Sequence, residues 1–73
     1  MPRLPRISGS EAVRALERLG FAVVRQRGSH IIMQRKIGAD TTTVPVPDHA
    51  ELRTGTLKAI IRQSGLPRDI FEA

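Results

Sequence analysis

The chain contains no cysteine, tryptophan or tyrosine, and its only aromatic residues are Phe21 and Phe71. Without cysteine it cannot form a disulfide framework or the usual structural zinc sites, which fits a reducing cytoplasm. Proteins that read single-stranded RNA by stacking its bases depend on exposed aromatic side chains. Any RNA binding should therefore depend on backbone contacts and charge, with loose sequence preference, and we expect both phenylalanines in the core.

Long apolar stretches are also missing. No run approaches the ~20 apolar residues that span a bilayer, and the basic residues 1–6 are not followed by the apolar segment of a signal peptide. The sequence thus predicts a cytoplasmic protein without a membrane segment. Its 73 residues predict one small domain, 1–73, with too little interior for an enclosed cofactor. We expect a shallow site, a polymeric substrate and no cofactor.

Acidic residues are scarce in the middle of the chain. Twelve Lys and Arg residues against seven Asp and Glu residues give a formal charge of +5, and no acid lies between Glu17 and Asp40. The basic residues of that interval are Arg18, Arg25, Arg27, Arg35 and Lys36. A basic surface of this kind attracts polyanions such as RNA. A solvated face without function, or a face for an acidic protein partner, would have the same composition.

Local signals predict two helices. The prolines of residues 1–7 indicate an N-terminal arm, and Ser8-Gly9-Ser10-Glu11 matches a capping box. Apolar residues then follow helical spacing up to Gly20, which is suited to the left-handed position that ends a helix. Thr54 can cap a second amphipathic helix that Gly65 closes.

Three strands are expected between the helices, over 21–26, 30–35 and 41–44. The third should end near Pro45, because proline cannot donate to a ladder, and an extended loop over 45–51 should follow. A connection over 36–40 joins the second and third strands, and a turn over 66–71 should dock Ile70 and Phe71 on the core. The expected fold class is α+β, in the order α-β-β-β-α, with a three-stranded antiparallel sheet and two helices on one face.

The segment Arg25-Gln26-Arg27-Gly28-Ser29-His30 combines a group that can transfer protons with groups that can bind phosphate. Histidine has an unperturbed pKa of ~6.5 and can both take and give a proton near neutral pH, while arginine forks suit phosphate oxygens. His30 is therefore a candidate catalytic residue for phosphodiester cleavage, although a histidine at a strand edge that only forms a hydrogen bond would give the same pattern. Gly28 should supply a positive φ and let RNA approach the backbone. The predicted RNA contacts are Arg25, Arg27, Gly28, Ser29, Arg35 and Lys36.

Strand alternation does not settle which way His30 points. Its same-face neighbours are Ile32 and Gln34, and the opposite set is Ile31, Met33 and Arg35, so both sets mix apolar and polar residues. Its exposure is expected from its position as the first residue of a strand.

His49 follows Asp48 in a proline-rich loop. It could supply a second proton-transfer group or merely stabilise the loop through a hydrogen bond. Two histidines without a carboxylate cluster do not make a metal site, so none is predicted.

Several segments together resemble the HicA-type mRNA interferase toxins. These segments are Gly20-Phe21, Arg25 to His30, Val44-Pro45-Val46-Pro47, Gly55-Thr56-Leu57 and Ile60 to Leu66. The resemblance implies a double-stranded-RNA-binding-domain-like fold, mRNA cleavage without a metal, and a HicB-type antitoxin that covers the catalytic histidine, which maps onto His30. Two alternatives remain open: a non-catalytic module that recognises RNA by backbone and shape, and a protein-interaction domain for an acidic partner.

Overall fold

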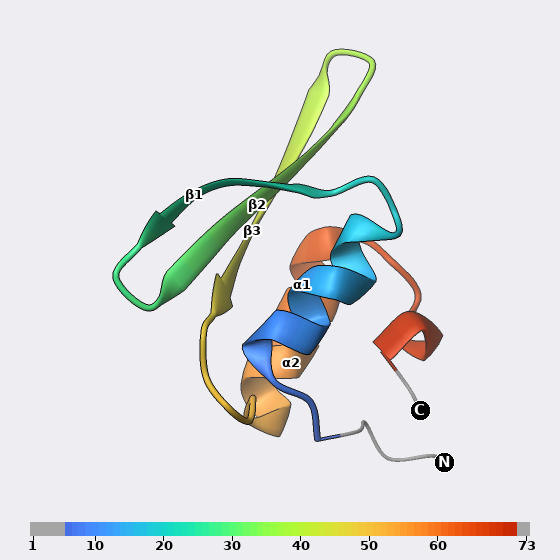
Figure 1. Ribbon diagram of the computed structural model, residues 1–73. Coiled ribbons are helices and arrows are strands. Elements are labelled where there is room, and N and C mark those ends of the chain that lie inside the picture. Colours follow the sequence, from blue (N-terminus) through green and yellow to red (C-terminus); the bar gives the residue numbers. More distant parts are fainter. Residues whose placement is uncertain (1–5, 72–73) are drawn as a thin grey trace.

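A computed structural model describes residues 6–71, except for the side chain of Arg68, and confirms the order α-β-β-β-α (Figure 1). The elements are α1 (Gly9–Glu17), β1 (Ala22–Arg27), β2 (His30–Ile37), β3 (Asp40–Pro47), α2 (Thr54–Ser64) and the short 3-10 helix η1 (Arg68–Phe71). Most of the predicted arm, residues 1–5, lies outside this range. None of the helices so described has the length and apolar character needed to cross a membrane.

The three strands form one antiparallel sheet in the order β1-β2-β3. The central strand β2 pairs His30 with Arg27 on one side and with Pro47 on the other. The β1–β2 ladder is irregular between Val23 and Arg25, where β1 contains one more residue than its partner. This β-bulge changes which side chains of β1 share a face with β2.

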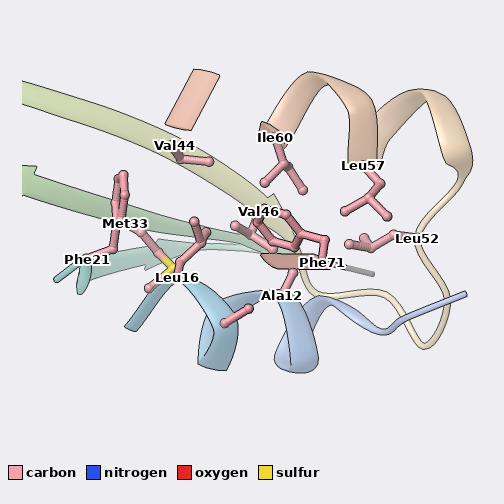
Figure 2. Close-up of a cluster of buried hydrophobic side chains, with 11 residues drawn as sticks. Ala12, Leu16, Phe21, Met33, Val44, Val46, Leu52, Leu57, Ile60 and Phe71 are labelled. Atoms are coloured by element: carbon pink, nitrogen blue, oxygen red, sulfur yellow. The ribbon is translucent and has the colours of Figure 1, made fainter. Parts of the chain in front are cut away.

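The core lies between one face of the sheet and both helices, as predicted. Figure 2 shows side chains of the sheet meeting those of the helices in a single cluster. Its members are Ala12, Ala15, Leu16, Phe21, Met33, Val44, Val46, Leu52, Leu57, Ile60 and Phe71. Both phenylalanines are buried, and Ile70 packs against the cluster. Within residues 6–71, no helix lies over the opposite face of the sheet (Figure 1).

The first helix begins and ends as its sequence signals predict. Ser8 Oγ accepts a hydrogen bond from the backbone N–H of Glu11 at 3.1 Å, and Glu11 Oε1 accepts one from the backbone N–H of Ser8 at 3.0 Å, which completes the capping box. The helix proper ends at Glu17. The N–H of Phe21 then bonds to the carbonyl of Leu16, and that of Gly20 to the carbonyl of Glu17. Gly20 has the positive φ, 96°, that this Schellman motif requires.

The expected cap at Thr54 is wrong. The N-cap of α2 is Arg53, which makes no side-chain cap hydrogen bond. Its carbonyl already accepts the first helical bond, from the N–H of Leu57 at 2.9 Å. Thr54 is therefore inside the helix, where its hydroxyl cannot act as the cap. The closing residue Gly65 is left-handed, with φ 69°, as predicted.

The predicted end of the third strand near Pro45 is also wrong, because β3 continues through Pro45 to Pro47. As β3 is an edge strand, only every second N–H is needed for its ladder with β2. The two prolines are two residues apart, so both of their nitrogens face the free edge. The expected connection over 36–40 is correspondingly a tight turn at Gly38 and Ala39, since β2 extends to Ile37 and β3 starts at Asp40.

Candidate functional site

His30 is exposed on the face of the sheet that the helices leave open. Met33 of the same strand is fully buried beneath the helices, and side chains alternate between faces along a strand. His30, an odd number of residues from Met33, therefore points to the opposite face, together with Ile32 and Gln34. The burial of Met33 decides the orientation that the sequence pattern left open.

The turn before His30 is held from two sides. Gly28 has a φ of 58°, the left-handed conformation that was predicted for it. The Gln26 side-chain amide donates to the Gly28 carbonyl at 3.1 Å. The carbonyl of Ser29 accepts a hydrogen bond from the backbone N–H of Asp48 at 2.6 Å. The hairpin is thus fixed to the segment that follows β3, and His30 starts β2 from an ordered turn.

The bulge at Val24 brings two arginines to the face of His30. Arg25 pairs with Ile32 and Arg27 pairs with His30, so both arginines share the open face. In an unbroken ladder continuing from Val23 and Met33, the alternation would turn Arg25 and Arg27 toward the helices. Both are exposed, and within residues 6–71 neither forms a salt bridge. The site is therefore a histidine with free guanidinium groups beside it.

Two of the six predicted RNA contacts lie elsewhere. Arg35 is on the helix-covered face, where its guanidinium carbon lies 4.9 Å from the centroid of the Phe21 ring. Lys36 shares the open face, but six residues along β2 place it about 20 Å from His30, toward the turn that projects away from the helices in Figure 1. The structure brings together Arg25, Arg27, Gly28 and Ser29 with His30, and leaves Arg35 and Lys36 apart.

His49 lies in the exposed segment that follows β3. Its backbone carbonyl accepts a hydrogen bond from the N–H of Gly9 at 2.8 Å, so this residue ties the loop to α1 through its main chain. It is two residues beyond Pro47, the ladder partner of His30. A role for its imidazole in proton transfer stays a prediction. In the described part of the chain, no group of three or more histidine, aspartate or glutamate side chains is placed to hold a metal ion.

A groove between β3 and α2 adjoins His30, and sequence reasoning missed it. It has a volume of about 350 Å³ and is open to solvent. Its lining residues are His30, Pro45, Pro47, Gly55, Thr56, Ala59, Ile60 and Gln63. The helical spacing of Thr56, Ala59 and Gln63 puts them on one side of α2, which was the available signal.

These features define a small basic α+β protein with an exposed histidine, adjacent arginines and a neutral groove on one side of a three-stranded sheet. A family model described as "HicA toxin of bacterial toxin-antitoxin" matches residues 9–66, from the start of α1 to just beyond α2. The chain belongs to this HicA toxin family, as the resemblance of its motifs indicated. A search of curated proteins found no match.

Proposed function

We propose that this chain is a ribonuclease toxin that cleaves mRNA without a metal ion, with His30 as a general acid or base. The observation that carries the proposal is the placement of Arg25 and Arg27 beside an exposed His30 in a member of the HicA toxin family. The two guanidinium groups would hold the phosphate, and His30 would move the proton.

The reaction would use the ribose 2′-hydroxyl of the RNA itself. The 2′ oxygen attacks the adjacent phosphorus and loses its proton, the bond from phosphorus to the 5′ oxygen breaks, and that leaving oxygen gains a proton. The products are a 2′,3′-cyclic phosphate and a 5′-hydroxyl end. Neutral His30 could take the first proton, or protonated His30 could give the second. Arginine forks would stabilise the negative charge that develops on the phosphate oxygens.

One histidine does not perform both proton transfers in the same step. His49 is our candidate for the second group, because the hydrogen bond between Asp48 and Ser29 keeps its loop beside the hairpin turn. A water molecule could serve in its place.

A partner that neutralises this protein would have to cover its exposed site. Arg25, Arg27 and His30 are all exposed on one basic face, so a protein with acidic side chains could cover them and block access by RNA. We propose that a HicB-type antitoxin acts in this way. It would cover the catalytic histidine directly.

RNA cleavage in EDTA tests the proposal. The wild-type protein, His30→Ala and the control Lys58→Ala, which removes an exposed charge from α2, are compared on the same RNA. Circular dichroism checks folding, and gel shifts check RNA binding. We expect His30→Ala to lose about 10²- to 10⁴-fold in cleavage rate while it still binds RNA. Equal cleavage by wild type and His30→Ala would overturn the assignment. Binding without any cleavage by the wild type would make the chain a non-catalytic RNA-binding module.

A further inference from the structure

Among the residues that the structure describes, no arginine, lysine, aspartate or glutamate lines the groove beside His30, although the chain is strongly basic. We propose that this groove binds the base of one unpaired nucleotide next to the cleaved phosphate, and that Gln63 hydrogen-bonds the edge of that base. This inference rests on the proposed ribonuclease function and names a substrate subsite for it.

At this end of the sheet, the two sides of His30 differ in charge. His30 is in the central strand, with Arg27 opposite it in β1 and Pro47 opposite it in β3. The arginines thus lie on the β1 side of His30, and the neutral groove lies on the other side, between β3 and α2. An RNA strand with a phosphate at His30 can place its charged backbone over the arginines and turn an uncharged base into the groove.

The walls of the groove suit a flat, uncharged group. Pro45 and Pro47 present saturated rings from β3, and Ala59 presents a methyl group from α2. The volume of about 350 Å³ is at the lower end of the range for small-ligand sites. A base could bury its faces against these walls without an aromatic partner, which the chain does not offer outside its core.

Gln63 supplies the polar contact that could distinguish one base from another. Its side chain is exposed and lines the groove, about two helical turns and ~10 Å along α2 from Thr56. A glutamine amide carries a donor and an acceptor side by side, and such a pair matches a base edge that shows an acceptor next to a donor. The other two glutamine amides of the chain are already hydrogen-bonded, that of Gln26 to the Gly28 carbonyl at 3.1 Å and that of Gln34 to Thr43 Oγ1 at 3.3 Å.

Cleavage-site mapping on a random RNA library provides the first test. Gln63→Leu keeps the size and helix propensity of the side chain but removes both hydrogen-bonding groups. We expect it to lose about tenfold of base discrimination at one position beside the cleaved bond, which is the scale of a single bidentate contact. The control is Gln34→Leu, which removes an amide on the same face as His30 but about 13 Å along the strand. It should leave the preference unchanged, and unchanged preference in Gln63→Leu would overturn the proposal.

A binding test separates this proposal from the ribonuclease function. A single-stranded hexanucleotide with 2′-deoxy sugars cannot be cut by 2′-hydroxyl attack and can be titrated into the ¹⁵N-labelled wild-type protein. We expect amide shifts at Thr56, Ala59 and Gln63, weakened in Gln63→Leu. Such shifts in a protein that does not cleave RNA would support the groove and reject the catalytic role. Cleavage without shifts would reject the groove alone. A Gln63→Leu protein that differed only in its inhibition by the antitoxin would show the groove to be a protein contact and overturn the proposal.

Discussion

The guanidinium carbon of Arg35 lies 4.9 Å from the centroid of the Phe21 ring, and its Nη1 donates to the carbonyl of Leu19 at 3.3 Å. These contacts join the middle of β2 to the turn that follows α1. The guanidinium is thus held on the face that the helices cover, away from His30. Arg35 therefore stabilises the fold, whereas Arg25 and Arg27 lie on the open face beside His30.

Replacing Arg35 with alanine should destabilise the protein without a selective effect on RNA. We expect the free energy of unfolding to fall by about 1–2 kcal/mol, because the substitution removes a cation–π interaction and the packing of the side-chain stem. Urea unfolding of Arg35→Ala measures this loss of free energy of unfolding. The control is Lys36→Ala, which replaces an exposed neighbour and should leave the free energy of unfolding almost unchanged. A loss of RNA affinity in Arg35→Ala at unchanged stability would contradict the structural role.

The sequence was sufficient for most of the architecture because the signals that set it are local. The capping box at Ser8 fixes where α1 begins, and the left-handed glycines Gly20 and Gly65 fix where α1 and α2 end. The strand pattern failed where tertiary context decided the outcome. Pro45 and Pro47 are tolerated in β3 because that strand is at the edge of the sheet. No neighbouring residue in the sequence indicates that this is an edge strand.

The site was predictable only in part. Gly28, Ser29 and His30 are consecutive, so local reasoning could find the turn and its histidine. The placement of Arg25 depends on the bulge at Val24, where no glycine or other local signal marks an irregular ladder. Gln63 and His30 line the same groove only because α2 packs beside β3, and no local sequence signal indicates that residues so far apart in the chain share a groove.

Arg25 and Arg27 should each bind one phosphate. We expect either alanine variant to reduce the slope of log affinity against log salt by about 1, because a protein that neutralises one phosphate fewer releases about one counterion fewer when it binds. Gel shifts across a salt series measure the slope. Arg14→Ala, which changes a residue of α1 in the helix layer, is the matched control. If it reduces the slope as much as the other two variants, binding is spread over the whole surface and not centred on His30.

Two glycines in the first turns of the two helices should respond oppositely to alanine. A Cβ at Gly9 would overlap the carbonyl oxygen of Pro47 and lie 3.1 Å from the Cα of Asp48, whereas a Cβ at Gly55 would meet nothing within 4 Å. We expect Gly9→Ala to cost about 1–3 kcal/mol of stability through overpacking and to lower RNA cleavage, because Pro47 pairs with His30.

Gly55→Ala is the control for that prediction. It should stabilise the protein by about 0.4–1 kcal/mol, because alanine restricts the unfolded chain more than glycine does. Thermal unfolding of both variants gives the comparison. Equal effects of the two substitutions would mean that the close approach of α1 to the Pro47–Asp48 backbone does not constrain the fold.

The capping box should make stability depend on pH on the acidic side. The hydrogen bonds from the backbone and the side chain of Ser8 hold the pKa of Glu11 below its ordinary value. A carboxyl with a lowered folded pKa contributes stability above its unfolded pKa, about 4.3, and that contribution is lost as pH falls through the folded pKa. Urea unfolding of wild type and Glu11→Gln should therefore show the wild type more stable at pH 7. The difference in free energy of unfolding between the two proteins should begin to shrink near pH 4.3. It should vanish below the folded pKa, since protonated Glu11 and glutamine are then both neutral. A difference that stayed constant between pH 7 and pH 2 would mean that the charge of Glu11 contributes nothing to the cap.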